Sequence, residues 1–259
     1  MYFRKATLII AAIIFLLLVG GGVYVYMKPM DGVLILEYHK VSNDDDVYSV
    51  PEREMAAQLD YLKAEGYTTI SMRDFARARK GRVELPEKPI VLTFDDGYKN
   101  NYTKLYPLLL ARDMKATIYV AVNRLGLDEY MTWENLREME AHGIEIGSHT
   151  ANHLPLTELS KDKQFEELRA SKLLIEWNGL KTVYAFSYPN GKYDSGIIQM
   201  LKEEGYLTAV TGDAGYNTFK TDPYRLHRLN IPKPRFGLLE FKLRIFKAKL
   251  LTTLNIYQH

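Results

Sequence analysis

The stretch Pro89-Ile90-Val91-Leu92-Thr93-Phe94-Asp95-Asp96-Gly97 joins an apolar run to the densest polar feature of this 259-residue chain. A short apolar run of this kind, bounded by Pro and Gly, is typical of a buried parallel strand. The two carboxylates then lie at the carboxyl end of the strand, which is where α/β barrels place their active sites. Alone, the pair has an ordinary alternative explanation, because Asp95 can cap a following helix and Asp96-Gly97 can form a turn.

Strand-like and helix-like segments alternate on both sides of this stretch. The strand candidates are residues 33–38, 67–71, 89–94, 116–121, 144–147, 183–187, 207–211 and 225–231, and the helix candidates are residues 51–65, 72–80, 102–112, 132–142, 158–177 and 195–204. Strands separated by helices indicate a parallel sheet covered by helices, either closed as a barrel or open and doubly wound. Seven or eight repeats of the alternation favour an α/β fold built as a distorted (β/α) barrel of seven to eight parallel strands.

The composition narrows the classes of function. The chain has 34 Lys and Arg against 32 Asp and Glu, a net charge of +2, so we expect no nucleic-acid partner. It has no cysteine, which excludes disulfides, thiolate metal ligands and a cysteine nucleophile. Any metal must therefore be bound by His and carboxylate side chains.

The amino end is predicted to be a transmembrane helix. Residues 8–27 are an uncharged apolar run, and roughly 20 such residues span a hydrocarbon core about 30 Å thick. Arg4 and Lys5 favour a cytoplasmic amino terminus, which places the rest of the chain outside the cytoplasm. We therefore expect a single-pass protein of the cell membrane. The alternatives are a cleaved signal peptide, which would make the protein secreted, and a buried core helix.

A second polar stretch, Gly147-Ser148-His149-Thr150-Ala151-Asn152-His153, includes the end of strand candidate 144–147 and continues beyond it. Two imidazoles four residues apart can face one way if the backbone is helical or turned, and imidazole suits Zn, Co, Ni and Fe. With one carboxylate from the earlier strand they form a three-ligand site with open positions for water and substrate. Single histidines are usually structural, but two of only six lie in this window.

Three motifs resemble the polysaccharide deacetylases with a NodB homology domain, classed as carbohydrate esterase family 4. They are Thr93-Phe94-Asp95-Asp96-Gly97, Ser148-His149-Thr150-Ala151-Asn152-His153 and Phe186-Ser187-Tyr188-Pro189-Asn190-Gly191. The opening Leu36-Glu37-Tyr38-His39-Lys40-Val41 is similar to the branch that acts on poly-N-acetylglucosamine at bacterial surfaces. The resemblance covers roughly residues 33 to 232 and includes neither end of the chain.

This resemblance implies a role for each matching residue. Asp96, His149 and His153 would bind a divalent metal, most often Zn²⁺, with Co²⁺ or Ni²⁺ as alternatives. Asp95 would be the general base for the attacking water. This division is chemically sound, since a metal lowers the pKa of water and polarises an amide carbonyl, and a carboxylate not bound to the metal can remove the proton.

The same resemblance assigns the substrate side of the site. Tyr188 and Pro189 would shape the sugar pocket, and the backbone N–H near Asn190 would help to bind the oxyanion. Two departures from the family pattern stand out. Residues 185–188 lack the Arg that supports the base in many members, and His227, the candidate general acid, directly follows Leu226 instead of lying one residue further on.

Two of the histidines outside the metal motif have alternative interpretations. His227 is the candidate acid, or it is a strand-end residue packed against its neighbours while the adjacent Arg or a water on the metal delivers the proton. His39, at the end of the first strand of the catalytic domain, either points into the same cleft or is structural.

These observations predict three regions and one principal function. Residues 1–28 are a cytoplasmic tip and anchor, residues 29–236 a deacetylase domain, and residues 237–259 a basic amphipathic helix that either lies on the membrane or packs on the domain. The predicted enzyme is a metal-dependent hydrolase that removes N-acetyl groups from an N-acetylglucosamine-containing polysaccharide. The alternatives are a catalytically silent carbohydrate-binding protein and a deacetylase of small amides or O-acetyl esters. The sequence does not identify the glycan linkage, the metal, the oligomeric state or any protein partner.

Overall fold

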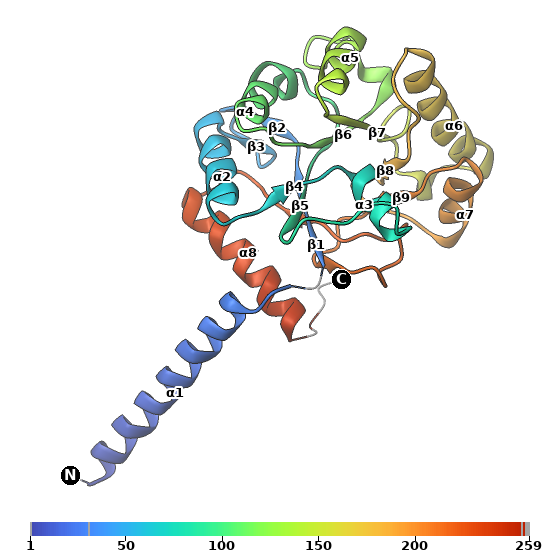
Figure 1. The fold of residues 1–259 in the computed structure, drawn as a ribbon. Helices are drawn as coiled ribbons and strands as arrows, with labels where there is room; N and C mark the ends of the chain where they lie inside the picture. Colours follow the sequence, from blue (N-terminus) through green and yellow to red (C-terminus); the bar gives the residue numbers. More distant parts are fainter. Residues whose placement is uncertain (1, 31, 255, 257–259) are drawn as a thin grey trace.

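The computed structural model describes residues 2–30, 32–254 and 256, and Figure 1 shows a ring of strands surrounded by helices, with one further helix projecting away. The main sheet contains β1 (Val33–Tyr38), β4 (Thr68–Thr69), β5 (Pro89–Phe94), β6 (Thr117–Val120), β7 (Glu145–Ser148), β8 (Ala185–Ser187), β9 (Thr208–Val210), β10 (Tyr216–Asn217) and β11 (Leu229–Asn230). A second small sheet pairs β2 (Lys40–Val41) with β3 (Ser49–Val50).

The α-helices are α1 (Tyr2–Met27), α2 (Glu52–Ala64), α3 (Met72–Arg79), α4 (Tyr106–Leu110), α5 (Trp133–Ala141), α6 (Lys161–Trp177), α7 (Ser195–Glu203) and α8 (Leu238–Thr253). Four short helical turns complete the elements: η1 (Asn101–Leu105), η2 (Val122–Arg124), η3 (Leu156–Glu158) and η4 (Pro189–Gly191).

The main sheet curls almost into a closed barrel. Its strand order is β10-β1-β5-β6-β7-β8-β9, with β4 added to β5 and β11 added to β1. A parallel bridge between Val210 and Leu226 joins the β9 edge to the segment that continues into β11. Because β11 pairs with β1 through Leu36 and Leu229, the chain closes the ring at this point. Eight of the nine described strands of the main sheet pair in parallel with a neighbour, so the prediction of a distorted barrel is confirmed.

Alternate residues of each strand pack into two apolar layers. Leu34 and Leu36 of β1 belong to the layer between the sheet and the surrounding helices. Val33 and Ile35 face inward, where Phe75 of α3 helps to fill the barrel. Burial on both faces explains why the strands are continuous apolar runs. The inward-facing series of β5, which begins with Val91 and continues through Thr93 to Asp95, therefore leads to the carboxyl mouth of the barrel.

Some elements differ from the sequence-based expectation. β10, β2 and β3 were not predicted, because they are two residues long and, unlike β4 and β11, do not lie within a longer strand-like run of the sequence. The expected helix over residues 102–112 begins instead as the π-helical turn η1, in which the Tyr106 N–H donates to the Asn101 carbonyl, five residues back. Pro107 follows at once and has no N–H with which to continue a regular ladder. Of the region 237–259 that was expected to be a basic amphipathic helix, residues 255 and 257–259 lie outside the described residues.

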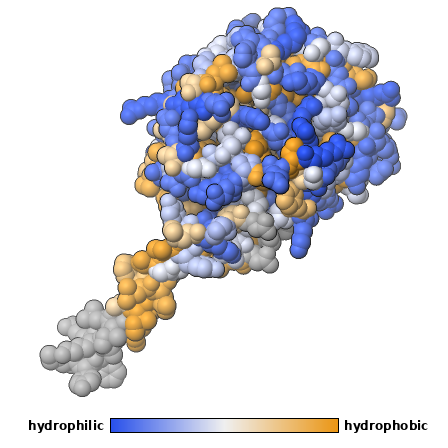
Figure 2. Space-filling model, in the orientation of Figure 1, coloured by the Kyte–Doolittle hydropathy of each residue, from blue (hydrophilic) through white to orange (hydrophobic). Residues whose placement is uncertain are grey.

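The amino-terminal helix α1 projects from the barrel as a single apolar rod (Figure 1). Residues 10–27 are long and apolar enough to cross a membrane and are almost entirely exposed in the isolated chain. Figure 2 shows the apolar surface of this helix where it leaves the largely hydrophilic domain. A buried core helix is therefore ruled out, and the segment has the properties of a membrane anchor or a signal sequence.

Candidate metal centre and active site

Strands β5 and β7 place the polar side chains of the site on either side of β6. Asp96 follows β5, while His149 and His153 follow β7, and the loops after these strands meet at the carboxyl mouth of the barrel. Asp96 and His153 have positive φ angles of 77° and 60°. Non-glycine residues rarely adopt this conformation, and its occurrence at two candidate ligands is typical of a functional site.

The three predicted ligands converge. Asp96 Oδ1 lies 3.0 Å from His153 Nε2 and 3.7 Å from His149 Nε2, and the three donor atoms all lie within 4.8 Å of one another. His149 Nδ1 lies 2.8 Å from the Ser187 carbonyl oxygen, which orients Nε2 toward the other ligands. Asp96 Oδ1 is buried and makes no hydrogen bond among the described residues. This imidazole and carboxylate set fits a divalent cation such as Zn²⁺.

Charge around Asp96 favours its ionised form. Burial alone would raise its pKa, but the close His153 ring, with Nε2 3.0 Å from Oδ1, and the nearby His149 ring hold the pKa well below its usual range. Burial also lowers the pKa of His149, which favours the neutral imidazole. An ionised carboxylate and a neutral imidazole are forms that ligate metals, so these states of Asp96 and His149 agree with the geometry.

Asp95, next to the candidate ligand Asp96, has different hydrogen-bond partners. Its two carboxylate oxygens accept hydrogen bonds from the Arg228 guanidinium at 2.9 Å each, and Ser187 Oγ donates to Oδ2 at 3.0 Å. Burial alone would raise the pKa of Asp95, but the Arg228 charge, with a contribution from His149, holds it below its usual value. Asp95 is therefore an ionised proton acceptor beside the candidate metal centre.

Arg228 corrects the expectation that the base lacks its supporting Arg. Residues 185–188 contain none, but Arg228, only 1% exposed, reaches Asp95 from the segment before β11. Burial lowers the pKa of Arg228, but the nearby carboxylates of Asp95 and Glu37 raise it above its ordinary value. This favours the charged guanidinium, which pairs with Asp95. The sequence signal was its place two residues after Leu226, on the same strand face.

The structure also brings His39 to the site. One donor atom each of His39, Glu37 and Asp95 lie within 4.8 Å of one another. The His39 carbonyl accepts a hydrogen bond from Asn101 Nδ2 at 2.9 Å, so the π-helical turn η1 fixes the end of β1. This position beside Asp95 favours the cleft-facing alternative for His39, although its ring also packs against Tyr48 with centroids 4.8 Å apart.

His227 lies on the same segment as Arg228 but in the alternate position. Leu226 packs in the barrel interior, and Arg228 reaches Asp95 from two residues further on. The backbone of His227 is bound on both sides by the Asn217 side chain, at 2.8 Å each. Its ring packs close to Gly215, where an added Cβ would lie 3.3 Å from Cγ.

The third motif forms the turn η4 after β8. Tyr188 is buried, stacks on Tyr193 with ring centroids 5.0 Å apart, and donates from its hydroxyl to the Tyr224 carbonyl at 3.0 Å. Pro189 is also buried, and Asn190 has a positive φ of 57°. Tyr188 and Pro189 are thus the buried part of the turn that contains Asn190.

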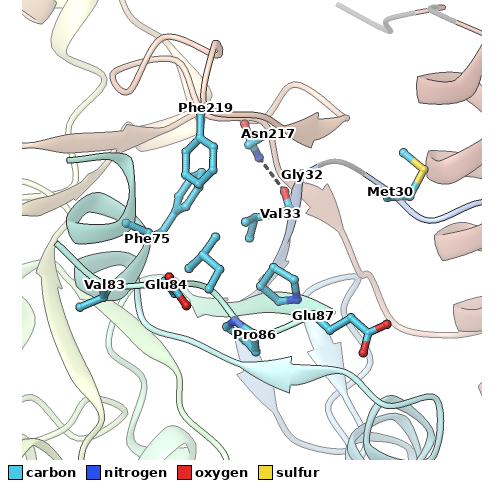
Figure 3. Close-up of a pocket in the computed structure, with 13 residues that line it drawn as sticks. Met30, Gly32, Val33, Phe75, Val83, Glu84, Pro86, Glu87, Asn217 and Phe219 are labelled. Atoms are coloured by element: carbon cyan, nitrogen blue, oxygen red, sulfur yellow. Dashed lines mark hydrogen bonds between the residues drawn. The ribbon is translucent and has the colours of Figure 1, made fainter. Parts of the chain in front are cut away.

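Two cavities lie at opposite ends of the strands. Figure 3 shows one of about 430 Å³ near the amino ends of β1 and β5, lined by Val33, Phe75 and Phe219 among others. A smaller one of about 230 Å³ is lined by residues that include Lys40 and Tyr98, the neighbours of His39 and Gly97. The larger cavity is distant from the polar cluster, so the smaller, polar one is the better candidate for part of a substrate cleft.

Fold and donor set together define an α/β barrel with a candidate divalent-metal centre at the carboxyl ends of its strands. A family model described as polysaccharide deacetylase matches residues 82–209. The Bacillus subtilis protein named "Putative polysaccharide deacetylase YxkH" is 34% identical over 197 residues, which cover 76% of this chain and 70% of that protein. The chain therefore belongs to the polysaccharide deacetylase family, as its motifs predicted.

Two further similarities extend over most of the chain. The poly-beta-1,6-N-acetyl-D-glucosamine N-deacetylase of Staphylococcus epidermidis is 23% identical over 238 residues, covering 81% of this chain and 82% of that protein. The structure of the Streptococcus pyogenes deacetylase PplD in complex with acetate matches with a TM-score of 0.76 and 27% identity, covering 84% of this chain and 99% of that chain.

Proposed function

We propose that this protein is a metal-dependent de-N-acetylase that hydrolyses the N-acetyl groups of an N-acetylglucosamine-containing cell-surface polysaccharide and releases acetate. The observation that carries the proposal is the ionised Asp95, held by Arg228 beside the convergent Asp96, His149 and His153. Metal-assisted hydrolysis requires a three-ligand metal site with a base beside it, and here the base is a carboxylate held in place by an Arg. The Staphylococcus and Streptococcus relatives are named as deacetylases, which supports this proposal.

A divalent ion bound by Asp96, His149 and His153 would polarise the acetyl carbonyl and lower the pKa of the attacking water. Asp95 accepts a proton from that water as the new C–O bond forms, while Arg228 and Ser187 keep its carboxylate in place. The backbone N–H near Asn190 donates to the developing oxyanion. When the C–N bond breaks, the sugar nitrogen takes up a proton, and the products are acetate and a glucosamine unit.

For the proton donor to the leaving nitrogen we propose His39, in preference to His227. His39 has a ring nitrogen within 4.8 Å of an Asp95 oxygen, whereas the His227 ring packs beside Gly215. A general acid must reach the leaving group from the same cleft as the base.

We further propose that α1 anchors the enzyme in the cell membrane with the barrel outside the cytoplasm. The uncharged span over residues 10–27 and the cations before it support this orientation. A polymer outside the cell is then the accessible substrate. If the segment is cleaved, the same domain acts as a secreted enzyme.

The test is acetate release by the full chain in detergent, loaded with Zn²⁺, from N-acetylglucosamine oligomers with β-1,6 and β-1,4 linkages and from peptidoglycan fragments. We expect chelator-sensitive release that favours one of these linkages. Asp95→Asn should abolish release while leaving oligomer binding intact, since it removes the base without removing a ligand. Binding without release by the wild type would favour the silent carbohydrate-binding protein, and release only from small amides or O-acetyl esters would favour the third function.

A further inference from the structure

We propose that α8 is an interfacial helix whose outward face lies on the bilayer that holds α1, with anionic lipid headgroups bound by its lysines. The outward face is defined by Phe236, Leu239, Leu243 and Leu254, and the proposal rests on α1 being a membrane anchor. It concerns how the domain is held at the membrane and is independent of the reaction.

The first observation is that α8 is apolar on two opposite faces. Phe241, Ile245 and Ala248 are buried, and Phe241 meets Tyr61 of α2 edge-on with ring centroids 6.0 Å apart. On the other face Leu239 and Leu243 are 61% and 57% exposed, and Phe236, just before the helix, is 76% exposed. A helix that only packs on a water-soluble domain needs a single apolar face, so the second face indicates a further partner.

The second observation is the position of the charges around that face. At about 100° per residue, Leu239, Leu243 and Leu254 share one side of the helix, Lys242 and Lys249 flank it on one edge, and Lys247 flanks it on the other. The only acidic residue of α8, Glu240, is already paired with Arg244 at 2.8 Å. Apolar residues bordered by lysines on both sides are typical of helices that lie in a membrane interface.

The third observation concerns the position of α8 relative to the membrane surface. Lys249 Nζ donates to the Tyr26 carbonyl oxygen of α1 at 2.6 Å, and Thr253 lies beside Met30. Tyr24 and Tyr26 end the apolar span, and tyrosine at this position is typical of the membrane-water interface. Figure 1 shows α8 lying across the domain end of α1. An anchored α1 therefore brings the carboxyl half of α8 to the level of the lipid headgroups.

The charges of α8 favour lipid, and not a second copy of the chain, as the partner of its outward face. α8 carries four cations and one acid, so two copies packed through this face would bring like charges together. Anionic headgroups instead attract such a segment, by about 1 kcal/mol per Lys or Arg near the surface.

The experiment uses the full chain in nanodiscs that hold one molecule each, so that no second copy is present. Because the chain has no cysteine, Leu243→Cys can carry the only NBD fluorophore. We expect this label to be blue-shifted and quenched by lipids with a headgroup nitroxide. The matched control is Trp177→Cys, equally apolar and 76% exposed, but on α6 away from α8 in Figure 1. It should be quenched at least fivefold less.

A label at Val19→Cys, in the middle of α1, separates this proposal from the anchor. Quenching of Val19 by acyl-chain nitroxides without quenching of Leu243 would show that α1 spans the bilayer while α8 faces water, and would overturn the proposal alone. Quenching at neither position would overturn the anchor and the proposal together. With both quenched, K242E/K247E should weaken the Leu243 signal severalfold in discs containing phosphatidylglycerol, and an unchanged signal would refute the headgroup contact.

Discussion

The contact between Asp95 and Arg228 joins residues 133 positions apart and places two opposite charges in the barrel interior. Each charge offsets the desolvation cost of the other, so removing one leaves a buried charge without its partner. Glu37, 3.3 Å from the guanidinium, adds a second carboxylate. The pair therefore stabilises the fold and also keeps the candidate base ionised.

Replacing this Arg tests both roles. Because Arg228 lowers the pKa of Asp95, the wild-type base stays ionised well into the acidic range, and Arg228→Met should move the acidic limb of the kcat/KM profile to higher pH. Breaking a buried pair also costs about 3 to 5 kcal/mol of stability. The measurements are a pH-rate profile and urea unfolding. Arg228→Lys keeps the charge without the bidentate geometry and should have an intermediate effect, whereas an unchanged acidic limb in Arg228→Met would contradict this account.

Two histidine variants test the identity of the acid. His39→Asn should lower kcat by about 10² to 10⁴ because the leaving nitrogen loses its proton donor, while His227→Asn should keep most of the activity. The loss in His39→Asn should be much smaller with an aryl acetate, whose phenolate leaves without protonation. Steady-state kinetics with both substrates decide the matter, and the reverse ranking of the two variants would return the role to His227.

The predictable part of the site lies in contiguous motifs. Asp95 and Asp96 follow one strand, and His149 and His153 follow another, so topology alone brings them to one mouth of the barrel. Arg228 was missed because its relation to Asp95 depends on where the segment before β11 closes the ring. That closure runs through the bridge between Val210 and Leu226, and the strand candidate at residues 225–231 does not show by itself which partner strand it meets.

At the scale of elements, strands that lie within apolar runs of the sequence were predictable, and isolated two-residue strands were not. All eight predicted parallel strands are present, and β1 and β5 contribute side chains to both packed layers. The antiparallel β10 is two residues long and was missed. The boundaries of helices depend on their capping residues, and in this protein some of these residues form a side-chain capping bond and others do not.

Two serine caps make this difference measurable. Ser71 begins α3 with a full capping box, in which its hydroxyl accepts from the Asp74 N–H and the Asp74 carboxylate accepts from the Ser71 N–H. Ser160 begins α6 without a side-chain cap bond. We expect Ser71→Ala to cost about 1 kcal/mol and Ser160→Ala a few tenths at most. Urea midpoints of the two variants provide the comparison, and equal losses would show that the capping bond contributes little.

For the whole molecule, binding of a divalent ion should stabilise the fold because the donors converge only when β5 and β7 are in place. Zn²⁺ at about 100 times its Kd would add about 2.7 kcal/mol, or a rise in Tm of about 5 to 10 °C for a chain of this size. His149→Ala should lose this rise because it removes a buried ligand, whereas His142→Ala, at the end of α5 beside Tyr106, should keep it. Thermal unfolding of the full chain in detergent, with chelator and then with added Zn²⁺, measures the effect independently of catalysis. Equal Tm values in the two conditions for the wild type would mean that Asp96, His149 and His153 do not form a metal site.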